Sequence, residues 1–281
     1  MLPFWLSIGV LSLVQAVLVA TPRPPSLTLL RRLQSRWWAL VLPLSIVVVI
    51  SAIALESASA RFLTYLALIA VPPLAAAALA WLLRGARPLL ALAVIPLFAI
   101  AWARQDALSG ETAALALSAL SCVILGWLTA CVVPPRWLKL GIYVMAAIDA
   151  WLVFSDLLQG PNAVLNAAAP AAELPRLQLA SFGSAVMGFG DLFIAATLGA
   201  LLASDRRLQL QGAVLAAVIC SVWDLLFLFV DQTPATVPIA LTLASLELRR
   251  NHRGENTKSR DHRRRQGESA DHEGATHRED A

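Results

Sequence analysis

The amino-acid sequence predicts an all-α membrane protein, a nine-helix polytopic bundle with a disordered cytoplasmic C-terminal tail. Its 281 residues are 58% hydrophobic and 14% charged, whereas a soluble domain is about 45–50% apolar and about 25% charged. The last 33 residues hold 9 of the 22 lysines and arginines and all 4 histidines, so the rest of the chain carries even less charge. This composition excludes a soluble enzyme with a conventional charged surface.

Nine apolar runs are predicted to be membrane helices, because a bilayer core about 30 Å thick needs roughly 20 apolar residues per helix. They cover residues 2–20, 37–55, 62–83, 88–103, 112–133, 138–158, 180–204, 211–230 and 235–248. The first run has no positive charge before it and arginines after it, which favours a retained helix over a cleaved signal peptide. The fourth and ninth runs are short, so we expect them to tilt little or to be partly broken.

Lysines and arginines alternate between the predicted loops. The loops after runs one, three, five and seven hold 10 of them, and the loops after runs two, four, six and eight hold 3. Because cytoplasmic loops are enriched in these residues, the pattern predicts an outside N-terminus and a cytoplasmic C-terminus. We expect an integral, multi-pass protein of the plasma membrane of a bacterium.

Composition shifts once, at Leu248/Arg249, where a membrane domain gives way to a polar tail (249–281). Within the membrane domain we expect a five-helix portion (1–137) and a four-helix portion (138–248). The tail has no apolar periodicity, so we interpret it as solvated and disordered rather than as a histidine metal site. The three cysteines, Cys122, Cys131 and Cys220, are scattered in apolar runs, which favours packing roles over a disulfide or a metal site. The basic residues lie in short loops and in a mixed-sign tail, so we expect no nucleic-acid partner.

Three aspartates lie well inside predicted spans: Asp149, Asp191 and Asp224. Ionisable groups at this depth are costly and mark candidate functional sites. Asp149 and Asp191 belong to consecutive antiparallel helices, at predicted depths of about 14 and 16 Å from the same face, so their side chains can meet. Gly188 and Gly190 precede Asp191 and permit local unwinding and close backbone approach.

A pair of carboxyl groups that shares one proton can hydrolyse a peptide bond. The ionised group acts as general base on a water, and the protonated group polarises the carbonyl and later protonates the leaving nitrogen. The alternative is that these acids only cap or hydrogen-bond neighbouring helices. Two acids at similar depth on adjacent helices, one of them in a GxGD motif, favour the catalytic interpretation.

These residues resemble the presenilin and signal-peptide-peptidase family of intramembrane aspartyl proteases, of the GxGD type. That family has nine helices, with catalytic aspartates on the sixth (Tyr-Asp) and the seventh (GxGD) and a Pro-Ala-Leu motif on the ninth. The sixth run and its exit read YVMAAIDAWLVFSDLLQGPNAVL, the seventh contains VMGFGDLFIAATLGALLA, and the ninth reads TPATVPIALTLASLEL. The resemblance covers about 138–248 and implies that this four-helix portion is catalytic, with Asp149 and Asp191 as the dyad.

The same resemblance implies that Gly188 and Gly190 shape the backbone beside the dyad. It also implies that Pro238, Ile239, Ala240 and Leu241 bind substrate in place of Pro-Ala-Leu. The chain departs from the family where Ile148, not Tyr, precedes Asp149 and where Ile239 interrupts the last motif. The implied reaction needs no metal and no organic cofactor. Its implied partners are a transmembrane peptide substrate, such as a signal-peptide remnant, and the lipid bilayer; the sequence leaves the oligomeric state open.

Other classes of protein remain as alternatives. A proton-coupled transporter would use Asp149, Asp191 and Asp224 as a relay. A prepilin-peptidase-like GxGD protease would carry a Lys soon after the motif, where this chain has Leu192-Phe193-Ile194. An inactive relative of the protease family would keep the fold and bind membrane partners. Serine and zinc intramembrane proteases are excluded, because no membrane His and no HExxH motif are present.

Overall fold

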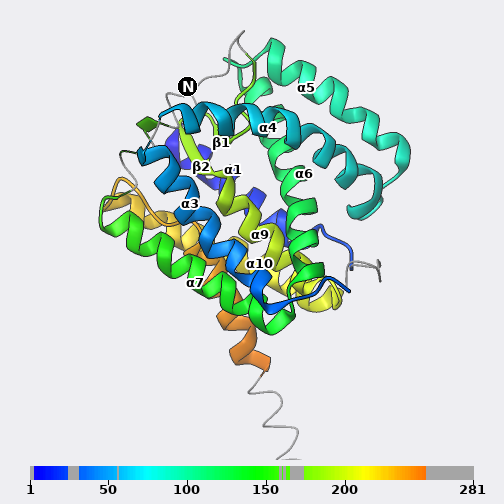
Figure 1. Cartoon of the computed structure of the whole chain (residues 1–281), viewed down its shortest axis with the longest axis vertical. Helices are drawn as coiled ribbons and strands as arrows, with labels where there is room; N and C mark the ends of the chain where they lie inside the picture. Colours follow the sequence, from blue (N-terminus) through cyan, green and yellow to red (C-terminus); the bar gives the residue numbers. More distant parts are fainter. Residues whose placement is uncertain are drawn as a thin grey trace, which may run out of the picture. The chain divides into compact units, whose positions relative to one another are not determined.

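A computed structural model of the chain describes residues 3–24, 32–55, 57–157, 160, 163–164 and 174–250 (Figure 1). They fall into two compact units that divide between Thr242 and Leu243. The predicted disordered tail lies, from residue 251 on, outside the described residues, and so do its four histidines. The predicted boundary between 1–137 and 138–248 stays a prediction.

The described part of the chain is mostly helical and holds nine α-helices, which confirms the predicted fold class. Their bounds are α1 Phe4–Ala20, α3 Val41–Leu55, α4 Ser57–Ala77, α5 Val94–Ala103, α6 Leu108–Val132, α7 Pro135–Phe154, α9 Phe189–Leu202, α10 Arg206–Asp224 and a last helix over 237–250. Each of the nine predicted runs overlaps one of these helices.

Four helical stretches are long and apolar enough to cross a membrane: Ala60–Leu82, Leu108–Val132, Pro135–Phe154 and Arg206–Leu228. Shorter apolar helices cover Phe4–Ala20, Pro88–Ala103 and Phe189–Leu202. Short 3₁₀ segments extend three helices: η1 Arg36–Leu40 before α3, η3 Pro88–Ala93 before α5 and η5 Leu225–Leu228 after α10. A π-helical segment, η2 Ala78–Leu82, follows α4. The chain is therefore an integral multi-pass membrane protein by length and composition of its helices.

The prediction of one continuous helix over 180–204 is wrong in about its first third, up to Gly188. A β-hairpin precedes α9, with β1 (Leu179–Phe182) antiparallel to β2 (Ala185–Gly188) and Phe182 opposite Ala185. The two-residue turn is Gly183-Ser184, and Gly183 has φ 60°, which a residue with a side chain rarely adopts. Gly at the first turn position is typical of a type II′ hairpin, whose twist matches that of the strands.

Two hydrogen bonds attach the hairpin turn to helices distant in sequence. The backbone N–H of Gly183 donates to Glu111 Oε2 in the first turn of α6, at 2.6 Å. The backbone N–H of Ser184 donates to Ser7 Oγ of α1, at 3.2 Å. The hairpin is therefore held between α1 and α6, and it leads directly into α9.

Helix α9 lies in the middle of the bundle, against α6 and α1 (Figure 1). A Cβ on Gly126 of α6 would lie 2.6 Å from the Ala196 backbone, and a Cβ on Gly199 of α9 would lie 2.6 Å from the Leu18 carbonyl oxygen. Only glycine permits helix backbones to approach this closely, and such contacts replace the hydrophobic effect between helices in lipid. They fix α9, and with it Asp191, inside the bundle.

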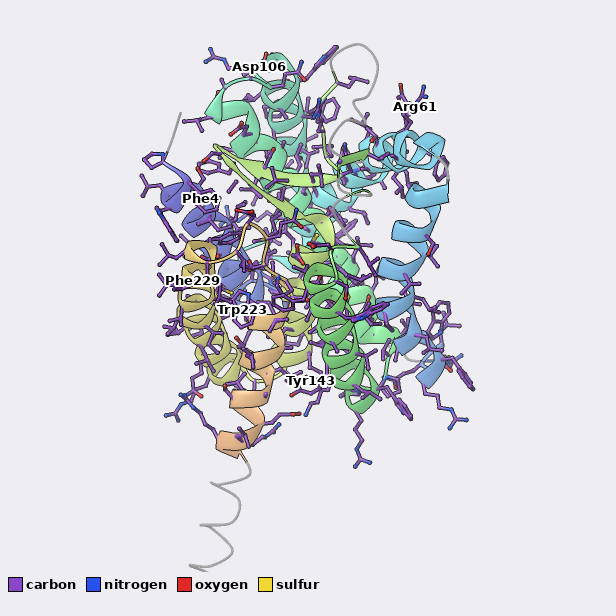
Figure 2. All side chains as sticks on the ribbon, turned by 90° about the vertical axis from the view of Figure 1, so that its left-hand side faces the viewer. Phe4, Arg61, Asp106, Tyr143, Trp223 and Phe229 are labelled. Atoms are coloured by element: carbon purple, nitrogen blue, oxygen red, sulfur yellow. The ribbon has the colours of Figure 1, made fainter. Side chains whose placement is uncertain are left out.

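Two loops that the charge pattern assigns to the same side of the membrane do lie at one end of the bundle. Figure 2 shows Arg61, near the start of α4, and Asp106, after α5, at that end, with Tyr143 of α7 nearer the other. Which side of the membrane each end faces stays a prediction.

Candidate functional site

The first predicted acid, Asp149, lies in α7 with only 6% of its surface exposed. Its Oδ2 accepts a hydrogen bond from the Thr236 hydroxyl at 2.6 Å and from the Thr236 backbone N–H at 3.4 Å. Thr236 is itself buried and directly precedes the last helix. Because a buried carboxyl group without donors is costly, these bonds both stabilise Asp149 and fix its position.

The second predicted acid, Asp191, lies in the first turn of α9 and is partly exposed. Its Oδ2 accepts a hydrogen bond at 3.1 Å from the backbone N–H of Gly188, the N-cap residue of the same helix. The carboxyl group thus lies at the positive end of the helix dipole. This bond caps the helix and uses one of the two carboxyl oxygens.

The structure brings Asp149 and Asp191 near enough for the charge of one to act on the other. Helices α7 and α9 face each other at this height, since a Cβ on Gly190 would lie 3.5 Å from the terminal methyl group of Met145. Met145 lies one turn before Asp149, on the same face of α7. Two carboxyl groups that lie close together cannot both ionise without cost.

The two acids meet by a different geometry from the one predicted. Asp191 lies in the first turn of a 14-residue helix rather than near the middle of a 25-residue one, and Asp149 lies five residues before the end of α7 at Phe154. The predicted depths of about 14 and 16 Å assumed a rise of 1.5 Å per residue. The hairpin, whose strands rise about 3.3 Å per residue, replaces the first part of that predicted helix.

The sequence analysis missed a buried glutamine that joins the segments around the acids. Gln15 of α1 is 1% exposed, and its Nε2 donates to the backbone carbonyl oxygens of Asp191, at 3.4 Å, and Ala235, at 3.3 Å. Its Oε1 accepts from Cys220 Sγ of α10 at 3.6 Å. Gln15 therefore connects the start of α9 with the residue before Thr236. Its one signal in the sequence is that it is the only amide side chain in the apolar run 4–20.

The predicted substrate-binding residues divide between the interior and the surface. Pro238, Ile239 and Ala240 are buried at the start of the last helix, two to four residues after Thr236. Leu241 is 43% exposed. The segment 235–240 thus lies beside Asp149, whereas the Leu241 side chain lines a separate surface pocket.

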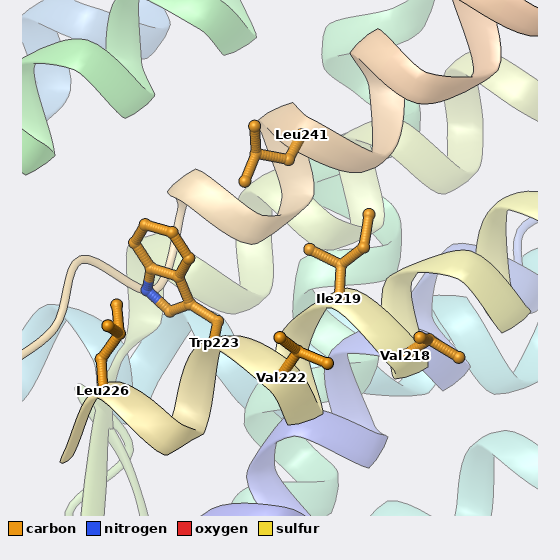
Figure 3. Close-up of a pocket in the computed structure, with 6 residues that line it drawn as sticks. All are labelled: Val218, Ile219, Val222, Trp223, Leu226 and Leu241. Atoms are coloured by element: carbon orange, nitrogen blue, oxygen red, sulfur yellow. The ribbon is translucent and has the colours of Figure 1, made fainter. Parts of the chain in front are cut away.

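This apolar surface pocket, of about 300 Å³, lies between α10, η5 and the last helix (Figure 3). The pocket is lined by Val218, Ile219, Val222, Trp223, Leu226 and Leu241. It contains no carboxyl group, so it offers no hydrolytic chemistry.

The third predicted acid, Asp224, lies at the end of α10 and is partly exposed. Its Oδ2 accepts a hydrogen bond from Ser12 Oγ of α1 at 2.7 Å. The cysteines are free and buried. Among the residues that the structure describes, no group of three or more His, Cys, Asp or Glu side chains could hold a metal ion.

Comparisons of the chain with protein-family models, with curated proteins and with solved structures found no match. The family resemblance therefore rests on the residues quoted above.

Proposed function

We propose that this chain is an intramembrane aspartyl protease-like protein of the presenilin and signal-peptide-peptidase type. The observation that carries the proposal is the close approach of α7 and α9 beside Asp149 and Asp191, where a Cβ on Gly190 would lie 3.5 Å from Met145. The segment before Pro238 lies beside Asp149, through the two bonds from Thr236 to that acid. Three separate stretches of sequence thus contribute to one site.

The proposed reaction is hydrolysis of a peptide bond by this pair. The ionised carboxyl group takes a proton from water, and the water oxygen attacks the scissile carbonyl carbon. The protonated carboxyl group donates its proton to the carbonyl oxygen, which gives a tetrahedral intermediate. The intermediate collapses as the leaving nitrogen receives the proton taken from water and the second carboxylate takes a proton back from a hydroxyl of the intermediate, which regenerates the pair. Water and two carboxyl groups suffice, so the reaction requires no metal and no organic cofactor.

The proposed substrate is a transmembrane helix, such as a signal-peptide remnant. A peptide bond within a helix is shielded by its own hydrogen bonds, so the substrate has to unwind near the acids. The hairpin β1–β2 supports this step because its strands carry unpaired edges among the described residues. An extended peptide that paired with such an edge would satisfy its backbone groups directly before Asp191.

The proposed orientation keeps the N-terminus outside and the C-terminus cytoplasmic, in the plasma membrane of a bacterium. The alternation of lysines and arginines supports it. Epitope tags after Arg206 and at the C-terminus should both be reached only from the cytoplasmic side. A tag accessible from outside contradicts the orientation but not the dyad.

The test is cleavage of a single-span reporter helix by the full chain in liposomes. We expect Asp149→Asn and Asp191→Asn each to abolish cleavage, because neither variant can share a proton between two carboxyl groups. Asp224→Asn is the matched control, since it removes an intramembrane acid outside the pair, and it should keep most of the activity. Cleavage that survives either dyad change contradicts the proposal.

The same liposomes separate the protease from a proton-coupled transporter. A transporter would move a solute when a pH gradient is applied and would leave the reporter helix intact. That result, with loss of transport in Asp224→Asn, would replace the proposed function.

A further inference from the structure

Three arginines from separate loops meet at one end of the helices α1, α4 and α10. Arg23 follows α1, Arg84 follows the end of α4 at η2, and Arg206 begins α10. The loops are joined by a short antiparallel bridge between Pro22 and Leu83, in which the Arg23 N–H donates to the Leu82 carbonyl oxygen at 3.0 Å. All three loops belong to the set that the charge pattern predicts to be cytoplasmic.

A fully buried glutamine, Gln209 of α10, organises this cluster. Its Nε2 donates to the carbonyl oxygens of Pro22 and Gly199, both at 3.1 Å, which fixes the side chain. Its Oε1 accepts from two guanidinium groups, from Arg84 at 2.7 Å and from Arg206 at 3.1 Å. Two positive groups therefore converge on one neutral oxygen, with their donor nitrogens no more than about 6 Å apart.

The charges of these arginines are not neutralised by the described part of the chain. The other acceptors of Arg84 and Arg206 are the carbonyl oxygens of Pro22 and Ala20. Partial burial, followed by the positive charges of Arg206 and Arg23, lowers the pKa of Arg84, as expected where like charges lie together. The neighbouring acid, Asp205, caps α10 through a bond from the Leu208 N–H at 3.1 Å.

We propose that Arg23, Arg84 and Arg206 form a binding site for a phosphate group. A guanidinium group presents a planar fork of donors that matches phosphate oxygens, and Gln209 holds two of them side by side in advance. Basic sites between membrane helices on the cytoplasmic side are suited to anionic headgroups. The phosphate belongs either to an anionic phospholipid or to a soluble phosphate compound, and the site is independent of the proposed protease activity.

The test measures the thermal unfolding midpoint of the purified full chain in neutral detergent during titration with phosphatidylglycerol. In a second arm, inorganic phosphate or pyrophosphate is titrated under the same conditions. We expect phosphatidylglycerol to raise the midpoint saturably. A rise with phosphate or pyrophosphate alone supports the site and assigns it to a soluble ligand. No rise with any of the three probes overturns the proposal.

Variants of single arginines show whether the rise in the unfolding midpoint comes from binding at this site. Arg23→Gln removes a charge whose side chain makes no hydrogen bond within the described part of the chain, so folding should persist. The apparent affinity should fall by about fivefold, the change expected for one arginine near an anionic surface. Arg84→Gln and Arg206→Gln should weaken binding further. Arg207→Gln is the matched control, because Arg207 is the exposed residue that follows Arg206 in α10 and its replacement removes the same charge. An equal loss in the Arg207→Gln and Arg23→Gln variants would show a nonspecific charge effect and would overturn the site.

Discussion

Asp149 and Asp191 carry the same carboxyl group, but that group is hydrogen-bonded to a distant residue at Asp149 and to a neighbouring residue at Asp191. Asp149 lies within α7, and its partner Thr236 is 87 positions away in the sequence. Asp191 lies in the first turn of α9, and its partner Gly188 is three positions away. One acid therefore depends on tertiary packing, whereas the other depends on the local geometry of a helix start.

This difference has a chemical consequence for the proposed pair. A hydroxyl donor at 2.6 Å is a strong bond to Asp149, and the backbone N–H at Asp191 is supported by the dipole of its own helix. Unequal surroundings favour unequal roles for two carboxyl groups that share a proton. Changes in the two regions should therefore differ in size, and the largest should come from the distant contact.

Among changes to the surroundings of the two acids, the largest effect is expected for Thr236→Val. The change keeps the shape but removes the hydroxyl donor, and hydrogen bonds to charged groups contribute about 1.5–3 kcal/mol. We expect cleavage of the reporter helix to fall on the order of tenfold to a hundredfold. Thr236→Ser keeps the hydroxyl and should retain most of the activity. Equal activity of the Val and Ser variants would show that this contact does not serve the site.

A smaller effect is expected for Gln15→Leu. It removes the amide that joins the carbonyl oxygens of Asp191 and Ala235, at a cost of about 1 kcal/mol per bond. Both the rate of cleavage and the unfolding midpoint should fall. Ser12→Ala is the control on the same helix, because it breaks the bond to Asp224 and should lower only the midpoint. If both variants lower activity alike, Gln15 acts through the stability of α1 alone.

The smallest effects on cleavage are expected for alanine substitutions at the two glycines of the GxGD motif, and the two effects should differ. A Cβ on Gly188 would lie 3.1 Å from Asp191 Oδ2, which is tight, whereas a Cβ on Gly190 would lie 3.5 Å from Met145, an ordinary contact. The backbone of Gly188, with φ −67° and ψ 147°, suits alanine, so its effect is steric. We expect Gly188→Ala to slow cleavage several-fold and Gly190→Ala to change it little. The reverse order would contradict the observed placement of Asp191.

Part of the hairpin was within reach of sequence reasoning. Gly183-Ser184 between two short apolar stretches is a known signal for a two-residue hairpin turn. Hydropathy does not distinguish the hairpin from a helix, because Leu179–Phe182 and Ala185–Gly188 are mostly apolar and an apolar stretch can form either structure. The bonds from Gly183 to Glu111 and from Ser184 to Ser7, which hold the turn, could not be predicted from neighbouring residues.

The nine apolar runs, the alternating basic loops, the intramembrane acids and the GxGD motif follow from the order of residues alone, because hydropathy and helix starts depend on near neighbours. The contacts of Thr236 with Asp149, of Gln15 with Asp191 and of Gln209 with two arginines were decided only by the tertiary structure. Such contacts depend on how each helix is rotated and how far it is displaced along its axis. An apolar stretch that is hydrophobic on every side encodes neither quantity.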